Sequence, residues 1–218
     1  VNNVTPVSSV LGGTGSNPLG IVMDKAGNIY TSNQNSNDVT KITPDGVSTI
    51  LGSTEPGFLI GLITIDKSGN VYTANYGSNN VTKITPDGVS TILGTTGSGP
   101  LGITIDSLGN IYTANNDSNN VTKITPAGES SVFGTTGSAP IGITIDSLGN
   151  IYTANNSSNN VTKITPAGVS SVFGATGSYP VGIIIDQAGN IYTANSNSND
   201  VTKITPQGVS TILGTTGS

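Results

Sequence analysis

A block of about 40 residues recurs five times in this chain of 218 residues, and the repeat is the strongest constraint on its fold. The motif Gly-Asn-(Ile/Val)-Tyr begins at Gly27, Gly69, Gly109, Gly149 and Gly189, in steps of 42, 40, 40 and 40 residues. The motif Val-Thr-Lys-Ile-Thr-Pro begins in step with it, at Val39, Val81, Val121, Val161 and Val201. We therefore expect five copies of one unit, with approximate bounds 17–56, 57–98, 99–138, 139–178 and 179–218.

One repeat contains four short strand patterns. Residues 101–105 alternate apolar and small polar side chains, and the segment 106–110 (Asp-Ser-Leu-Gly-Asn) is a hairpin turn signal. Residues 111–114 and 121–125 follow as strands, separated by an Asn-rich loop. After a Pro-Ala-Gly turn, residues 129–133 form a short fourth strand.

Four strands per repeat, with no helical periodicity, predict a single all-β domain over residues 1–218, a β-propeller in which each repeat is one blade. Blades pack on both faces, which explains why the strands carry Ile, Val and Thr on both sides. The Pro-x-Gly-Ile start is expected to be the innermost strand, where glycine lets the blades approach closely near the axis.

The motif Pro-x-Gly-Ile-x-x-Asp-x-x-Gly-Asn-Ile-Tyr, followed by an Asn-Val pair, resembles the NHL repeat and its relatives in virginiamycin B lyase-like and gluconolactonase-like propellers. The resemblance covers residues 17–218. It implies the propeller fold but no single function, because this fold group includes enzymes, sensors and scaffolds.

Closure of the ring has two predicted solutions. Residues 7–16 match residues 169–178, so residues 1–16 are expected to supply a partial outer-blade strand, with residues 3–5 as a stub of a third strand. The C-terminus also ends in a fourth strand, at 209–213. Five blades are favoured because five complete repeats are present. The alternative is a six-bladed or oligomeric closure, with self-association through an open blade edge.

Composition excludes several classes of function. The net charge is −5 and the chain contains no Arg, which argues against nucleic acid as a partner. No apolar run of ~18 residues is present, so no membrane span is predicted. Richness in Ser, Thr, Asn and Gly with only 9% charged residues favours a secreted or cell-surface protein.

The chain has no His and no Cys, which removes histidine general bases, Ser-His-Asp and Cys-His systems and Cys/His metal sites. Virginiamycin B lyase-like enzymes depend on a catalytic His, so the resemblance does not carry that activity to this chain. Gluconolactonase-like enzymes hold a divalent cation with Glu, Asp and Asn near the axis, and Glu55 is the one Glu expected near it. We therefore predict a protein that is not an enzyme, with no catalytic residue, metal site or cofactor, and calcium as the alternative.

Three side chains recur once per repeat. The Asp residues at 24, 66, 106, 146 and 186 are interpreted as turn caps, with calcium ligation as the alternative. The Tyr residues at 30, 72, 112, 152 and 192 are interpreted as packing aromatics, and the Lys residues at 41, 83, 123, 163 and 203 as solvated or edge residues.

The loops between the second and third strands supply the candidate ligand-binding residues. Five Asn-rich copies on one rim would present amides and hydroxyls that suit sugar hydroxyls, and repetition would give avidity. Asn also tolerates left-handed turn geometry, so turn formation is the competing interpretation. The candidate ligand-binding residues are Asn33, Asn75, Tyr76, Asn115, Asn155 and Asn195.

Repeat two departs from the pattern. Residues 53–60 replace the usual crossover, and Leu62 is expected to add a residue that produces a bulge. Glu55 and Phe58 would then lie in an irregular segment near the axis, as an asymmetric pocket.

Four functional hypotheses follow. The first is a non-catalytic binding or scaffold propeller with a protein or other ligand, and the second is a repeat lectin that binds carbohydrate through the Asn-rich loops. The third is a calcium-dependent lactonase-like hydrolase centred on Glu55. The fourth is an excised or engineered model propeller.

Overall fold

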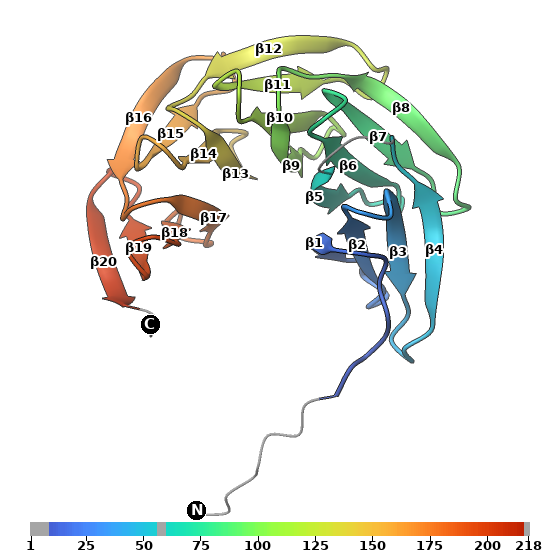
Figure 1. The fold of residues 1–218 in the computed structure, drawn as a ribbon. Coiled ribbons are helices and arrows are strands. Elements are labelled where there is room, and N and C mark those ends of the chain that lie inside the picture. The colour runs from blue at the N-terminus through green and yellow to red at the C-terminus, as the bar shows by residue number, and fades with distance from the viewer. Residues whose placement is uncertain (1–8, 56–59, 216–218) are drawn as a thin grey trace, which may run out of the picture.

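The computed structural model describes residues 9–55 and 60–215, which form five antiparallel four-stranded sheets (Figure 1). Blade 1 consists of β1 (Pro18–Met23), β2 (Ile29–Asn33), β3 (Asp38–Ile42) and β4 (Ser48–Ser53). Blade 2 consists of β5 (Ile60–Ile65), β6 (Val71–Asn75), β7 (Asn80–Ile84) and β8 (Ser90–Thr95). Blade 3 consists of β9 (Pro100–Ile105), β10 (Ile111–Asn115), β11 (Asn120–Ile124) and β12 (Ser130–Thr135). Blade 4 consists of β13 (Pro140–Ile145), β14 (Ile151–Asn155), β15 (Asn160–Ile164) and β16 (Ser170–Ala175). Blade 5 consists of β17 (Pro180–Ile185), β18 (Ile191–Asn195), β19 (Asp200–Ile204) and β20 (Ser210–Thr215).

Every element in the described ranges is a strand, and these ranges include no helix that could cross a membrane. In each blade the first strand lies innermost and the fourth outermost, as Figure 1 shows. The turn between the first two strands contains a glycine with positive φ, such as Gly109 at 85°. The turn between the last two contains another, such as Gly128 at 89°. Side chains with a Cβ rarely adopt this conformation, so the glycines fix the positions of both turns.

The hydrophobic core is divided among the contacts between successive blades. One cluster joins Tyr72, Ala74 and Val81 of blade 2 to Ile103, Ile111 and Ile124 of blade 3. The next cluster joins Tyr112 of blade 3 to Ile143 and Ile151 of blade 4. The Tyr112 ring also meets Phe133 edge to face, at 5.1 Å between centroids. This arrangement confirms the prediction that blades pack on both faces for blades 2, 3 and 4, which have a neighbour on each side. Four of the five recurring tyrosines pack in these clusters, whereas Tyr192 of blade 5 does not.

The inner strands approach one another closely, as the repeated glycine predicted. A Cβ on Gly102 of β9 would overlap the carbonyl oxygen of Ile141 in β13. A Cβ on Gly142 would lie 2.5 Å from the carbonyl oxygen of Val181. Contacts of this kind link β1 to β5, β5 to β9, β9 to β13 and β13 to β17.

Five blades are confirmed, and they form an open arc. Figure 1 shows an opening between blade 5 and blade 1, on the side where β17 and β1 face each other. The five blades take up more than half of the circle. Residues 9–16, the described part of the extra N-terminal segment that matches a fourth strand in sequence, do not close this opening.

The described part of the N-terminal segment, residues 9–16, takes the place of a fourth strand from a preceding blade. The Gly15 N–H donates to Thr40 Oγ1 of blade 1 at 3.0 Å, and the Gly97 N–H donates to Thr122 Oγ1 of blade 3 at the same distance. A Cβ on Gly12 would meet Ser48 Oγ at 2.6 Å, as a Cβ on Gly52 would meet Ser90 Oγ at 2.7 Å. The segment predicted as an outer strand therefore lies against blade 1, but its described residues 9–16 do not form a strand. The predicted stub at residues 3–5 lies outside the described residues.

The bulge predicted at Leu62 is present but is not specific to repeat two. The pairing of β5 with β6 is irregular between Ile60 and Ile63, and that of β13 with β14 is irregular between Pro140 and Gly142. Leu62 is therefore not an inserted residue. The additional residues of repeat two precede Ile60, and Phe58 lies outside the described residues.

Candidate functional site

The loops between second and third strands lie at one end of the strands in every blade, and so do the crossovers between blades. We call these loops the Asn-rich rim; they comprise residues 33–38, 75–80, 115–120, 155–160 and 195–200. Backbone hydrogen bonds join each loop to the crossover beside it, as where the Asn116 N–H donates to the Gly99 carbonyl at 2.8 Å. All five loops contain a left-handed Asn at the fifth position, for example Asn37 at φ 52° and Asn119 at φ 53°. Turn chemistry therefore accounts for part of the Asn content.

The five asparagines predicted to bind ligand are buried at the ends of the second strands. Asn115 is 0% exposed, accepts from Thr113 Oγ1 at 2.9 Å, and donates to Asn120 Oδ1 at 2.7 Å and Thr122 Oγ1 at 2.8 Å. The same network recurs at the counterparts, Asn33, Asn75, Asn155 and Asn195. These amides hold the loops in place, and ligand binding by this rim stays a prediction that depends on neighbouring, exposed groups.

Replacing Asn115 with Ala should lower the free energy of unfolding by about 2–3 kcal/mol, because two buried threonine hydroxyls lose a partner. Asn116→Ala, one residue further along and partly exposed, removes a single 3.3 Å bond to the Pro140 carbonyl and should cost less than about 1 kcal/mol. Urea unfolding of both variants measures the difference. Equal losses would contradict the structural role assigned to Asn115.

Tyr76, the sixth predicted residue, lies differently from the five asparagines. Its hydroxyl reaches from the loop of blade 2 to the Asp117 carboxylate of blade 3, at 2.9 and 3.0 Å from the two oxygens. This hydrogen bond raises the pKa of the Tyr76 hydroxyl above its usual value, with smaller contributions from burial and the carboxylate charge. Tyr179, in the crossover before blade 5, is 49% exposed on the same rim. Two tyrosines outside the once-per-blade set are thus at least partly exposed on this rim.

The turns between first and second strands lie at the opposite end of the strands from the Asn-rich rim. In blade 3, Asp106 Oδ1 accepts from the backbone N–H groups of Leu108 and Asn110, both at 2.9 Å. Its Oδ2 accepts from Asn110 Nδ2 at 2.7 Å and from the Tyr112 hydroxyl at 3.1 Å. All five repeats contain this network, so the Asp ring caps turns, as the first interpretation held. Within the described residues, no group of three acidic side chains is placed to hold a metal ion.

Four tyrosines of these turns have raised pKa values, which favours their neutral form. Burial, together with the neighbouring Asp24, raises the pKa of Tyr30 to about 12. Burial likewise raises the pKa of Tyr72, Tyr112 and Tyr152, with the partner carboxylate adding to the effect. Each of these four phenols is thus a poor general base at neutral pH and donates a hydrogen bond to its Asp.

The raised pKa values predict a specific loss of stability in alkali. A group with a raised pKa in the folded state stabilises the fold fully below its unfolded pKa, near 10, and this contribution is lost as pH rises through the folded value. The melting temperature should therefore fall from about pH 10 upwards. Thermal unfolding followed by circular dichroism between neutral pH and this range measures it. Tyr112→Phe should show a shallower fall, and an identical slope would contradict the assignment.

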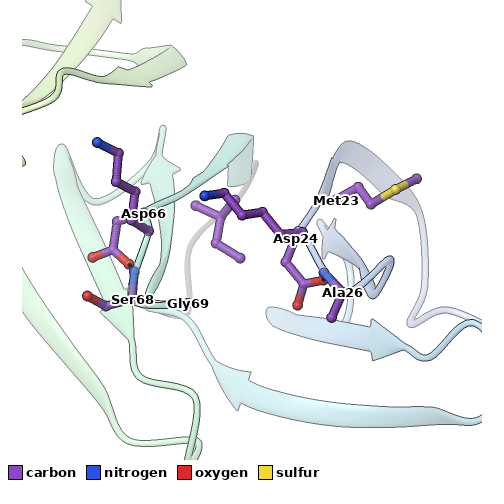
Figure 2. A pocket seen from close by; sticks show the side chains of 9 residues that line it. Met23, Asp24, Ala26, Asp66, Ser68 and Gly69 are labelled. Carbon is purple, nitrogen blue, oxygen red and sulfur yellow. Dashed lines mark hydrogen bonds between the residues drawn. The ribbon is translucent and has the colours of Figure 1, made fainter.

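A hollow of about 410 Å³ lies between the first two of these turns (Figure 2). Asp24 and Asp66 line it with Met23, Ser68 and two lysines, Lys25 and Lys67. The corresponding positions of the other blades hold Ser107, Ser147 and Gln187, so the lysine pair is specific to this place. The carboxylates already bind their own turns, which leaves the lysine ammonium groups as the distinctive chemistry of a shallow, open surface.

Glu55 does not lie near the axis, which corrects the prediction for repeat two. It lines a hollow of about 290 Å³ with Ser90, Thr91 and Ile92 of the outermost strand β8. A metal-dependent hydrolase centred on Glu55 therefore lacks the inner position that the hypothesis required.

Comparison with known proteins agrees with this architecture. The model of the virginiamycin B lyase family matches residues 6–213. A streptogramin B lyase structure is similar at a TM-score of 0.81 and 20% identity, over 92% of this chain and 69% of that chain. A catalytically inactive histidine-to-alanine variant of virginiamycin B lyase from Staphylococcus aureus, solved with quinupristin, gives 0.81 and 23%, over 93% and 71%.

A chain of a nidogen/laminin complex is also similar, at a TM-score of 0.76 and 17% identity, over 92% of this chain and 80% of that chain. No curated protein matches the sequence. At these identities the solved structures show a shared propeller fold. Family membership is shown by the family model, which matches nearly the whole chain. The chain belongs to the virginiamycin B lyase family.

Proposed function

We propose that this chain is a non-catalytic member of the family, a binding propeller that holds a protein or other ligand on the Asn-rich rim. The observation that carries the proposal is the complete absence of histidine, in a family where a histidine-to-alanine variant of a lyase is described as catalytically inactive. The Asp and Tyr side chains that recur in every blade are committed to turn networks and are thus unsuited to replace an imidazole. The similar chain from the nidogen/laminin complex supports a propeller that acts by binding.

Incubation with quinupristin tests the non-catalytic part of the proposal. We expect the intact compound to be recovered unchanged, because the chain has no group with the pKa of an imidazole to move a proton at neutral pH. Mass spectrometry of the compound after incubation, beside an active lyase as positive control, measures this. Turnover above the rate without protein would overturn the proposal.

A carbohydrate ligand is the second candidate, and the exposed tyrosines favour it. A tyrosine offers an apolar ring face and a polar hydroxyl, and Tyr76 lies beside Asp117 and Gly99 of the neighbouring blade and crossover. Such a cluster suits a ligand that has hydroxyls on an apolar ring.

A glycan array and an array of extracellular proteins, each with and without calcium, test where the ligand binds. We expect selective binding that falls at least about tenfold in the double variant Tyr76→Asn, Asp117→Ser. These substitutions introduce the residues that blade 4 holds at the same positions, Asn156 and Ser157, so the fold should be unaffected. The matched control is Lys25→Ser, Lys67→Ser at the opposite end, which should bind normally. A blank glycan array would eliminate the carbohydrate candidate, and blank results on both arrays would contradict rim binding.

A further inference from the structure

The segment that leads into blade 2 breaks a hydrogen-bond pattern shared by the segments that lead into the other four blades. In those, a threonine hydroxyl donates to the carbonyl of the glycine that follows it, as Thr96 Oγ1 does to Gly97 at 2.8 Å. The same bond recurs, at 2.8–2.9 Å, from Thr14, Thr136 and Thr176. Before blade 2 the glycine is replaced by Glu55, and the Thr54 hydroxyl has no partner among the described residues.

A glutamate cannot follow the path that this glycine takes in the other segments. A Cβ on Gly97 would lie 2.4 Å from Ser118 Oγ and 2.7 Å from Asn120 Oδ1, and its counterparts are enclosed in the same way. The Gly97 N–H also donates to Thr122 Oγ1, at 3.0 Å. Because Glu55 has a Cβ, the segment into blade 2 takes another course, and a hollow of about 290 Å³ lies beside it.

The hollow is lined mostly by polar side chains. Its blade 1 side consists of Ser53, Thr54 and Glu55, and its blade 2 side consists of Thr82, Ser90, Thr91 and Ile92. Among these described lining residues, Glu55 alone is charged. Thr54 is 6% exposed, and the hydroxyls of Thr54 and Ser90 are both buried without a partner. Ser170, the counterpart of Ser90 in blade 4, shares this property, so the Thr54 hydroxyl is the feature specific to this place.

A primary ammonium group matches these side chains. It carries one positive charge and three N–H donors, and it accepts no hydrogen bond. The Glu55 carboxylate supplies the opposite charge. The two covered hydroxyls supply further acceptors when Thr54 and Ser90 rotate about their Cα–Cβ bonds to another staggered rotamer. Ile92, which is 45% exposed, offers apolar surface to the methylene groups of an alkyl chain.

Other classes of ligand fit this hollow less well. Calcium takes about six to eight oxygen ligands, and no group of three acidic side chains lies together in the part of the chain that the structure describes. An anion would be repelled by Glu55. The volume is close to the lower limit of the ~300–1,000 Å³ that is typical of small-molecule sites, which suits one side chain or a small amine and not an oligosaccharide.

We propose that this hollow binds a primary alkylammonium group, at the end of a lysine side chain or of a free amine, with Glu55 as its counter-ion. The buried Thr54 hydroxyl, which lowers stability while it lacks a partner, gains one when the ammonium group binds. The site uses none of the residues of the Asn-rich rim, so its test is separate from that of the proposed function.

Titration of the full chain with n-butylammonium, followed by heteronuclear NMR spectroscopy, tests the proposal. We expect saturable shifts of the amide signals of residues 53–55 and 90–92. Glu55→Gln should weaken binding about tenfold or more, because the charge-assisted hydrogen bond is lost. The matched control is Glu129→Gln, the same substitution at the chain's other glutamate, which is exposed in blade 3 and should bind as the parent does.

Two further probes separate hydrogen bonding from charge and identify the source of the ammonium group. Butyltrimethylammonium has the same charge but no N–H donor, so it should bind at least about fivefold more weakly than n-butylammonium. The amide of α-N-acetyl-lysine presents the same ammonium group from a peptide. Binding as tight as that of n-butylammonium would identify a polypeptide partner, and binding of n-butylammonium alone would identify a free amine.

Four results would overturn the inference. They are the absence of shifts at residues 53–55 and 90–92, equal affinity in the parent and in Glu55→Gln, equal or tighter binding of the trimethylated analogue, and shifts of these signals by calcium but not by the amine. The comparison of the two amines requires no substitution, so it decides the question even where a variant perturbs the fold.

Discussion

Replacing Asp106 with Ala should lower the free energy of unfolding by about 4 kcal/mol, through the loss of four hydrogen bonds to one carboxylate. The change leaves the Tyr112 hydroxyl and the Asn110 amide without an acceptor, in side chains that are 5% and 7% exposed. Two backbone N–H groups of the turn lose theirs as well. A buried donor without a partner costs more than the bond itself contributes, which is why this turn should be sensitive.

The matched control for this variant is Asp87→Ala, in the turn between the last two strands of blade 2. Asp87 accepts from Thr85 Oγ1 on the surface, and the same position is Ala127 in blade 3 and Ala167 in blade 4. We expect its urea midpoint to stay close to that of the parent. Similar losses in the two variants would show that the carboxylate network is not what stabilises the first turn.

The same carboxylate predicts how stability depends on acid. Burial acts to raise the pKa of Asp106, but the hydrogen bonds from Asn110, Tyr112 and Leu108 outweigh it and the pKa is lowered. A lowered pKa in the folded state stabilises the fold above the unfolded value, near 3.9, and that contribution is lost as pH falls through the folded value. Asp106→Ala should therefore lose stability relative to the parent at neutral pH but much less at pH values below this range.

Most of the fold could be predicted because each signal is local and is repeated five times. Residues 111–114 and 121–125 were expected as strands, and β10 and β11 cover 111–115 and 120–124. The Asp and Gly of the first turn and the Pro and Gly of the last one determine the boundaries by backbone geometry alone. Tight contact between inner strands followed from a glycine placed where a strand would otherwise hold a larger residue.

The role of the asparagines could not be read from the loop composition. Asn115 is the last residue of β10, so its side chain lies on the same buried face of the strand as that of Thr113, two residues earlier. The pattern Thr-x-Asn, with Thr122 across the ladder, was the signal that could have shown this. The opening of the ring could not be predicted either, because the angle between blades is set by packing between repeats and not by the sequence pattern of a single repeat.

Gly102→Ala should be among the most destabilising single substitutions in the chain, with a loss of about 3 kcal/mol or more. The new Cβ would overlap the Ile141 carbonyl oxygen, a backbone atom of β13 that cannot rotate away. Blades 3 and 4 would have to separate at the inner strands, which exposes the Ile143 contact between them. Urea and thermal unfolding measure the loss, and a change below about 1 kcal/mol would contradict the close packing.

Gly182→Ala is the same substitution at the same position of the repeat, in the one blade with no described neighbour beyond it. Its Cβ would meet only Ala194, at an ordinary van der Waals distance of 3.8 Å. Alanine also restricts the unfolded chain, so this variant should be neutral or more stable by a few tenths of a kcal/mol, up to about 1 kcal/mol. Urea unfolding of the two variants side by side measures the difference, and an equal loss in both would contradict the close approach of β9 and β13. Because the substitution and the position in the repeat are the same, the difference between the two variants reports how much of the loss in Gly102→Ala comes from contact with the next inner strand.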